Sequence, residues 1–326
     1  MKKFLILATI VLFFVAGCAT NNTRIVSVVK INQTNASPLN NTSNISTNVS
    51  VNLSSNLTVN ITSNLTNITS NITANVSATA SQNATLKNLT VEFIDLNGNS
   101  ILIRTPSKKL ILIDGGDNSE GLRITKYLIS KGITKLDYVF DSNAEIDNVG
   151  GLASIIYNFN DSQAYYPGIS YDTNNNIAYM RYISYSKNYS KPAIPVTEDK
   201  EFDMGDGAIL SAFVPYENNI SNGAPINDTI VFRLDFKDAS FLFLGDCKSI
   251  CFEKIKNKDI SADVLKVNGF VPQEIIDAVS PKIIIYDNLK NETIKPAGVK
   301  VYSKADGTVF IMSDGNKYFI STTGKA

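Results

Sequence analysis

The 326-residue chain contains no histidine. Imidazole is the commonest nitrogen ligand of protein-bound metals, so no site that depends on it can exist anywhere in this sequence. Cysteine is scarce, with only Cys18, Cys247 and Cys251. Histidine-based metal chemistry is therefore excluded.

Acidic residues are missing from the N-terminal part of the chain. The first is Glu92, whereas five basic residues precede it: Lys2, Lys3, Arg24, Lys30 and Lys87. From Glu92 onward the chain carries 25 basic residues (30 less those five) and 30 acidic residues, a net charge of −5. Proteins that bind nucleic-acid backbones present a basic surface, so we expect no strong nucleic-acid binding.

The N-terminus has the pattern of an export signal. Lys2 and Lys3 precede an apolar run from Phe4 to Ala16, too short to span a membrane. Residues 15–18, Val-Ala-Gly-Cys, resemble a lipobox, which implies that 1–17 is a lipoprotein signal peptide and that Cys18 carries a diacylglyceryl thioether. The alternative is an ordinary signal peptide with a coincidental cysteine. Either reading predicts an extracytoplasmic protein, and the first predicts a lipid anchor in the membrane.

Residues 18–87 are rich in Asn, Ser and Thr and almost uncharged. Such a segment buries too little apolar surface to offset its ordering entropy, so we predict a disordered stalk. It repeats the Asn-x-Ser/Thr acceptor motif of N-glycosylation at Asn52, Asn56, Asn60, Asn64, Asn67, Asn71 and Asn75. The alternative is a low-complexity spacer whose motifs are unused. Glycans on a lipoprotein stalk favour an archaeal cell surface.

The domain after the stalk has further acceptor motifs and two cysteines. The motifs begin at Asn160, Asn188, Asn219, Asn227 and Asn291, and we expect them on surface loops. Cys247 and Cys251 are four residues apart, which suits a local disulfide or two free thiols on one helix face. Both remain open, whereas two thiolates alone do not complete a zinc site.

Short β-type runs and helical runs fill residues 88–326, which we assign to one folded domain. Strands are predicted at 90–95, 100–105, 109–114, 136–140, 208–214, 229–236, 240–244, 264–267, 282–286, 299–302, 308–312 and 318–321. Helices are predicted at about 121–131, 150–158, 175–187, 247–258 and 272–279. Hairpins followed by alternating strands and helices indicate mixed sheets flanked by helices, an α/β (α+β) class.

Seven short segments follow one another in a characteristic order: 93–95 (Phe-Ile-Asp), 100–103 (Ser-Ile-Leu-Ile), 112–116 (Leu-Ile-Asp-Gly-Gly), 136–139 (Leu-Asp-Tyr-Val), 149–152 (Val-Gly-Gly-Leu), 242–246 (Leu-Phe-Leu-Gly-Asp) and 262–267 (Ala-Asp-Val-Leu-Lys-Val). Their order resembles the metallo-β-lactamase superfamily, and within it the extracellular hydrolase domain of ComEC-type DNA-uptake proteins. The resemblance implies an αββα sandwich of two mixed sheets.

The metal-binding pattern of that family is broken here. Its active members place H-x-H-x-D-H before the two glycines, and the corresponding residues are Asn143, Glu145, Asp147 and Asn148. The later bridging aspartate is kept as Asp246. The further histidine is replaced within Asn268-Gly269-Phe270, so we do not expect zinc.

Carboxylates remain where the ligands are lost. If the fold is right, Asp114, Asp141, Glu145, Asp147 and Asp246 converge at one sheet end. Such a cluster suits calcium or magnesium, with Asp141, Glu145, Asp147 and Asp246 as ligands. The alternative is structural: Asp114 and Asp147 bind loop backbones, and Asp246 caps the helix near Cys247.

A tyrosine-rich stretch from Tyr165 to Tyr189 favours core packing, with stacking of sugars or bases as the alternative. We therefore predict a surface lipoprotein with a catalytically degenerate domain that serves in binding or envelope architecture. The competing hypothesis is a divalent-cation-dependent phosphodiesterase or nuclease that uses the carboxylate site. The sequence does not identify a protein partner.

Overall fold

The computed structural model describes residues 88–169, 176–217, 221, 224–287 and 296–324. The predicted signal peptide (1–17) and stalk (18–87), with Cys18 and the stalk acceptor motifs, lie outside the described residues, as do Asn219 and Asn291. Those features remain predictions. Within the described part of the chain, no helix is both long and apolar enough to cross a membrane.

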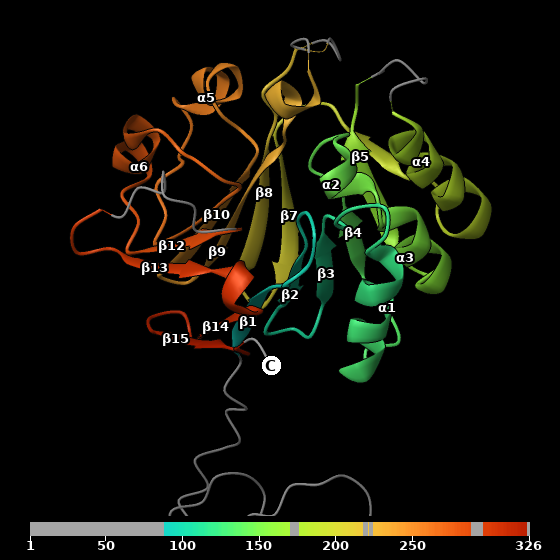
Figure 1. The fold of residues 1–326 in the computed structure, drawn as a ribbon, viewed down its shortest axis with the longest axis horizontal. Coiled ribbons are helices and arrows are strands. Elements are labelled where there is room, and N and C mark those ends of the chain that lie inside the picture. The colour runs from blue at the N-terminus through green and yellow to red at the C-terminus, as the bar shows by residue number, and fades with distance from the viewer. Residues whose placement is uncertain (1–87, 170–175, 218–220, 222–223, 288–295, 325–326) are drawn as a thin grey trace, which may run out of the picture. The chain divides into compact units, whose positions relative to one another are not determined.

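Eight strands form the first sheet, in the order β15-β14-β1-β2-β3-β4-β5-β6 (Figure 1). Its strands are β1 (Leu89–Phe93), β2 (Ile101–Arg104), β3 (Leu110–Ile113), β4 (Tyr138–Phe140), β5 (Gln163–Pro167), β6 (Ile194–Val196), β14 (Val309–Ser313) and β15 (Tyr318–Thr322). The pairs from β15 to β3 are antiparallel, and those from β3 to β6 are parallel. The first sheet is therefore mixed.

Seven strands form the second sheet, in the order β13-β12-β11-β10-β9-β8-β7. They are β7 (Lys200–Gly205), β8 (Ala208–Phe213), β9 (Val231–Phe236), β10 (Ala239–Gly245), β11 (Val264–Val267), β12 (Ile283–Tyr286) and β13 (Lys300–Ser303). The half from β7 to β10 is antiparallel and the half from β10 to β13 is parallel. The predicted second mixed sheet is thus present.

Helices cover the outer face of each sheet (Figure 1). The first sheet packs against α1 (Gly121–Ser130), α2 (Ile146–Val149), α3 (Leu152–Asn158) and α4 (Ile177–Tyr189), and the second against α5 (Ile250–Ile255) and α6 (Gln273–Val279). Two short 3₁₀ helices, η1 (Pro225–Asp228) and η2 (Lys304–Asp306), lie in connections. The result is the expected αββα sandwich.

The alternation of side chains along each strand decides which core they join. On β4, Phe140 points into the core between the sheets, whereas Val139 joins the core under the helices. The Phe140 ring stacks on Tyr165 at 4.9 Å and meets Phe232 of the opposite sheet at 5.3 Å between centroids. Aromatic side chains therefore join the two sheets directly beneath the end of β4.

Every strand and helix predicted from the sequence corresponds to an observed element. Three strands were missed, namely β5, β6 and β7. β5 reads Gln-Ala-Tyr-Tyr-Pro and β6 contains Pro195, so neither shows aliphatic alternation. β7 has only Phe202 and Met204 as buried apolar residues among charged ones. Their strand form depends on pairing with neighbours rather than on local pattern.

Candidate functional site

The residues aligned with the family's metal ligands meet at one edge of the sandwich. The chain leaves β4 at Phe140, and the following loop supplies Asn143 before α2 supplies Asp147 and Asn148. Asp246 follows β10 directly. Backbone bonds fix the approach of the two sheets here, because Ile230 N donates to Ser142 O at 2.8 Å.

Two asparagine side chains form a closed hydrogen-bond network around Asp246. Asn143 Nδ2 donates to Asp246 Oδ2 at 3.2 Å, and Asn148 Nδ2 donates to the same oxygen at 2.8 Å. Asn148 Nδ2 also donates to Asn143 Oδ1 at 2.8 Å, and that oxygen accepts from the backbone N–H of Glu145 at 2.8 Å. Both amide nitrogens thus point at the carboxylate, with Asn143 bound further to Thr229 Oγ1 at 3.0 Å.

Asp114 binds the start of the loop after β4 through two hydrogen bonds. Its Oδ1 accepts from the backbone N–H of Ser142 at 2.8 Å, and its Oδ2 accepts from Ser142 Oγ at 2.9 Å. Burial, opposed by these two hydrogen bonds and reinforced by the nearby charges of Asp246 and Asp147, raises the pKa of Asp114 to about 7. This contact is the backbone-binding role that the structural alternative assigned to Asp114.

Glu145 and Asp147 lie at the open side of the site, partly exposed. Burial and the charge of Asp246 raise the pKa of Asp147 to about 6, and the same two causes raise the pKa of Glu145. The described residues place no lysine or arginine within ion-pair distance of Glu145, Asp147 or Asp246. Negative charge therefore accumulates at the mouth of the site.

Asp141 lies apart from this mouth. It is 1% exposed, and neither of its carboxylate oxygens accepts a hydrogen bond of normal geometry. The backbone N–H of Asn143 is directed toward the carboxylate but is not placed for a full hydrogen bond. Burial, together with the charge of Asp114, raises the pKa of Asp141 well above its ordinary value. Its acidic neighbour is thus Asp114 rather than the three carboxylates of the predicted cation site.

Two buried lysines complete the site on the side of the second sheet, and sequence reasoning missed both. Lys266 Nζ donates to Asn268 Oδ1 at 2.7 Å and forms an ion pair with Asp287. Lys304 Nζ lies 3.3 Å from Asp287 Oδ1 and donates to Gly98 O. Burial lowers the pKa of Lys304, although Asp287 opposes this. The sequence did contain a signal for Lys266, because this lysine interrupts the apolar run Val-Leu-Lys-Val.

The Asn99 side chain links the amide network to the lysines. One end of its amide donates to Asn148 Oδ1 at 2.6 Å. The other end lies 2.7 Å from Asn268 Oδ1 and 2.6 Å from Asp287 Oδ2, so a 180° rotation would transfer the donor to those oxygens. In the orientation described, Asn99 Oδ1 also accepts from Lys266 Nζ at 3.4 Å, which links the two halves of the site. After the rotation it would face the acceptor Asn148 Oδ1, so the two sets of bonds exclude each other.

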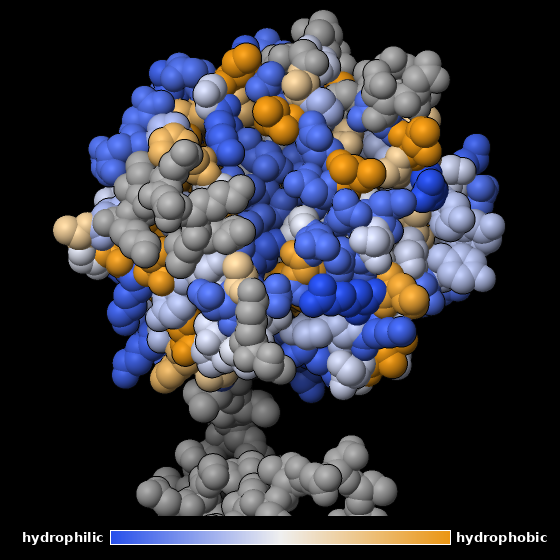
Figure 2. Space-filling view, in the orientation of Figure 1, coloured by the Kyte–Doolittle hydropathy of each residue, from blue (hydrophilic) through white to orange (hydrophobic). Residues whose placement is uncertain are grey.

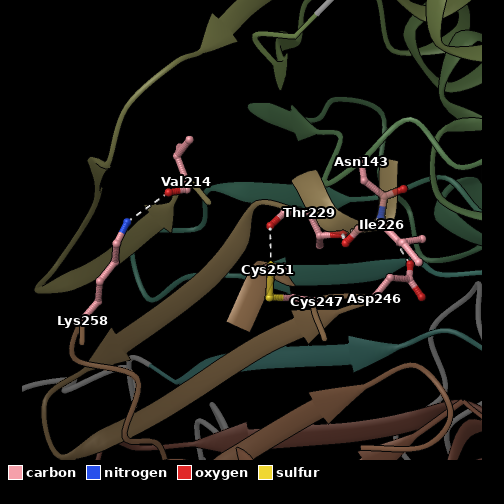
Figure 3. The surroundings of a disulfide bond; sticks show 8 residues. All are labelled: Asn143, Val214, Ile226, Thr229, Asp246, Cys247, Cys251 and Lys258. Atoms are coloured by element: carbon pink, nitrogen blue, oxygen red, sulfur yellow. Dashed lines mark hydrogen bonds between the residues drawn. A yellow bond between two sulfur atoms is a disulfide. The ribbon is translucent and has the colours of Figure 1, made fainter. Parts of the chain in front are cut away.

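A disulfide braces the turn that carries Asp246. Cys247 and Cys251 are joined, with their Cα atoms 5.2 Å apart, and Figure 3 shows the bond beside Thr229 and Asp246. Helix α5 begins only at Ile250, with Ser249 at its N-cap position. Asp246 therefore does not cap this helix, because the disulfide-closed turn separates them. The predicted start at Cys247 was three residues too early.

Hydrophilic side chains gather over the middle of the face drawn in Figure 2, between α5 and α2, with hydrophobic side chains scattered around them. Helix α5 follows Asp246 in the chain, and helix α2 contains Asp147. Gly269 adopts φ +68, and apart from its chain neighbours no atom lies within 4 Å of where a Cβ would be. The expected ligand position at Gly269 thus has no side chain of its own and borders open space.

The donor set does not fit zinc. Catalytic zinc is held by imidazoles with a carboxylate, whereas here both replacing amides direct N–H groups toward Asp246 and offer it hydrogen atoms rather than lone pairs. Among the described residues, no group of three or more His, Cys, Asp or Glu side chains is placed to hold a metal ion.

Comparison with known proteins agrees with the architecture. Residues 94–251 match the sequence profile of the metallo-beta-lactamase superfamily. With the two mixed sheets and their outer helices, this match establishes a metallo-β-lactamase fold and supports a place in that superfamily. No curated protein matches the sequence.

Solved structures with some similarity include three of very different description. The metallo-beta-lactamase fold protein YhfI from Bacillus subtilis is 12% identical, with a TM-score of 0.41 over 61% of this chain and 85% of that one. Human tRNase Z, short form, is 11% identical, with a TM-score of 0.41 over 66% and 96%. CmlA, a diiron beta-hydroxylase from Streptomyces venezuelae, is 10% identical, with a TM-score of 0.41 over 61% and 44%.

The raised pKa of Asp114 predicts that the folded state loses stability as pH rises. Its folded pKa is about 7 against an ordinary 3.8, so its contribution is complete below pH 3.8 and is lost as pH passes through about 7. We expect the free energy of unfolding, measured in urea at pH 5 and pH 8, to fall by at least about 1.4 kcal/mol, which corresponds to one pK unit.

Two variants separate this contribution from the rest. Asp114→Asn should make the decline smaller, because its side chain does not ionise, whereas the raised pKa values of Asp141 and Asp147 should keep part of it. Glu198→Gln, at an exposed carboxyl, should leave it unchanged. An unfolding free energy that is level or rises between pH 5 and pH 8 in the unsubstituted protein would contradict the assignment.

Proposed function

We propose that the protein is a lipid-anchored, extracytoplasmic protein whose metallo-β-lactamase-fold domain binds a ligand or partner without hydrolysing it. One observation carries the proposal: Asn143 and Asn148 both donate an amide N–H to the same oxygen of Asp246. In hydrolases of this fold the corresponding carboxylate faces metal ions. Here its charge is met by hydrogen bonds from within the chain.

The chemistry of the fold supports the same conclusion. A metal-dependent hydrolase uses its ion to lower the pKa of a bound water from about 15.7 to about 7. Amide and carboxylate side chains without a bound metal ion do not supply that effect, and the chain has no imidazole to hold zinc. The ammonium groups of Lys266 and Lys304 are engaged with Asp287 and backbone oxygens, so they do not replace the ion at the mouth.

The resemblance to one particular group within the superfamily is also part of the proposal. The segments from Phe93 to Val267 resemble the extracellular hydrolase domain of ComEC-type DNA-uptake proteins. The net charge of −5 from Glu92 onward disfavours a nucleic-acid ligand, and so do Glu145 and Asp147 at the mouth, which have no lysine or arginine partner among the described residues. A binding or envelope role therefore agrees better with the charge than retained nuclease activity does.

The proposal itself makes two predictions, of which the first concerns metal and turnover. After dialysis of the full chain against trace zinc, we expect less than stoichiometric zinc by elemental analysis. Hydrolysis of bis(p-nitrophenyl) phosphate, single-stranded DNA and a β-lactam should stay at background with zinc, manganese, magnesium or calcium, while a known zinc hydrolase turns over in parallel.

The same assay can overturn the proposal. Turnover that is lost in the double variant Asp147→Asn, Asp246→Asn would establish the competing divalent-cation hydrolase, with those carboxylates at its centre. Turnover that survives the double variant would remove the carboxylate site as well and would point to a different pocket.

The second prediction concerns the anchor. If Cys18 carries the lipid, the full chain should partition into detergent and Cys18→Ser should release it to the aqueous phase. Cys251→Ala serves as the matched cysteine control and should stay with the detergent, because Cys251 is in the domain disulfide. Equal membrane retention of Cys18→Ser and the unsubstituted chain would refute lipidation at this residue.

A further inference from the structure

A cluster of tyrosine rings is exposed where α3 and α4 pack side by side (Figure 1). Tyr157 of α3 and Tyr189 of α4 are 57% and 49% exposed, with ring centroids 5.3 Å apart. The Tyr185 ring lies 5.1 Å from that of Tyr189. We call these three residues the tyrosine cluster. Grouped exposed aromatic rings commonly mark a surface that something covers.

The rest of the tyrosine-rich stretch has a different role. Tyr179 and Tyr182 are buried, and their hydroxyls donate to backbone oxygens: Tyr179 to Ile169 O at 3.2 Å, and Tyr182 to Tyr165 O at 3.1 Å. Those residues account for core packing. Tyr185 is also partly packed against the core under the helices, so the exposed ring of Tyr189, which meets that of Tyr157, is the part of the pattern that core packing leaves unexplained.

An N-glycosylation acceptor motif lies within the tyrosine cluster. Asn188-Tyr189-Ser190 occupies the end of α4, so the acceptor Asn188 is three residues after Tyr185 and adjacent to Tyr189. Residues three apart on a helix are neighbours on one face. Asn188 is exposed, and its amide nitrogen lies 3.4 Å from Ser184 Oγ. The motif was expected on a loop, and the structure places it in the last helical turn.

A second motif, Asn160-Asp161-Ser162, flanks the same cluster. Asn160 is exposed, three residues after Tyr157. Its Ser162 is fully buried, however, and Ser162 Oγ donates to Phe159 O at 2.7 Å. Ser190 of the first motif is only half-buried, in the turn that follows α4. Accessibility therefore favours Asn188 over Asn160.

We propose that Asn188 carries an N-linked glycan whose first sugar packs on the rings of Tyr185 and Tyr189. The inference rests on the proposed export of the chain. In the modification, Asn188 Nδ2 bonds to the anomeric carbon of a lipid-linked phosphosugar donor. The bond from that carbon to the phosphate oxygen breaks, the amide gives up one proton, and the lipid phosphate leaves. No oxidation or reduction is involved.

Packing follows from the fixed position of the sugar. An amide-linked ring at Asn188 starts beside Tyr185, which lies three residues earlier on the same face of α4, and the Tyr189 ring is 5.1 Å from the Tyr185 ring. The sugar therefore needs no independent association to reach the two rings. The C–H face of a sugar ring and the face of a tyrosine are both apolar, so contact removes exposed apolar surface from water. The glycan thus covers the tyrosine cluster and stabilises the end of α4.

Peptide mass spectrometry of the full chain isolated from its native membranes tests the modification. Cleavage after Lys187 and Lys200 releases residues 188–200, because Lys191 precedes Pro192 and is not cut. This peptide contains Asn188 as its only acceptor motif. We expect it to carry a hexose- or hexosamine-based mass increment. Residues 136–181, released by cleavage after Lys135 and Arg181, report Asn160 in the same digest.

Thermal unfolding tests the packing. Glycosylated protein should unfold about 2–4 °C above Asn188→Gln, the shift typical of one modest interaction in a domain of this size. In the background Tyr185→Ala, Tyr189→Ala, the change Asn188→Gln should lower the midpoint no further. Asn160→Gln is the matched control and should leave the midpoint unchanged.

The outcomes separate this inference from the proposed function. Modified stalk peptides with an unmodified 188–200 peptide would overturn the inference alone. Unmodified peptides throughout would overturn it together with the glycosylated stalk, and would leave the non-catalytic site untouched. A modified Asn188 whose removal lowers the midpoint equally with and without the two tyrosines would refute the packing.

Discussion

The arrangement of the site depends on one carboxylate oxygen, Asp246 Oδ2, which accepts hydrogen bonds from Asn143 and Asn148. These bonds join the loop after β4 and the helix α2, which belong with the first sheet, to the end of β10 in the second sheet. A buried polar group without a partner costs about 1–3 kcal/mol. Each amide therefore has to be placed so that its donors and its acceptor are all used, and the closed network achieves this.

Charge is arranged on two sides of this network. Glu145 and Asp147 face the mouth, where burial and Asp246 raise their pKa values. On the other side Lys266 and Lys304 share Asp287 in the interior. Lys266 is in register with Phe243 and Ile285, which face the core between the sheets, so its side chain reaches the loop of the first sheet. Hydrogen bonds and ion pairs between described residues thus connect the two sides of the site across the sandwich.

Much of the fold could be predicted from the sequence because many of its strands are continuous apolar runs. β3 and β10 are short apolar runs bounded by turn residues, and they lead directly to Asp114 and Asp246. β5 to β7 could not be predicted in this way, since β5 is largely aromatic, β6 contains a proline and β7 is mostly charged. Their strand form comes from pairing with the neighbouring strands of the two sheets. The same limit applies to helix α5, whose first turn is displaced by the Cys247–Cys251 disulfide.

The candidate site was predictable in its members but not in its contacts. The sequence placed Asn143, Asn148 and Asp246 together through the family pattern. It did not show that the amide nitrogens would point at Asp246, because this direction is fixed by Thr229 and by the backbone of Glu145. It also grouped Asp141 with the mouth, although the structure buries that residue beside Asp114.

The central claim is that hydrogen bonds have taken over the work of a metal ion in holding this site together. A ligand that binds only the folded state raises the unfolding midpoint in proportion to the logarithm of its concentration above its dissociation constant. The direct measurement is the thermal unfolding midpoint of the full chain in a chelator and in increasing zinc. We expect the same midpoint throughout, and a midpoint that climbs steadily with zinc would contradict the account.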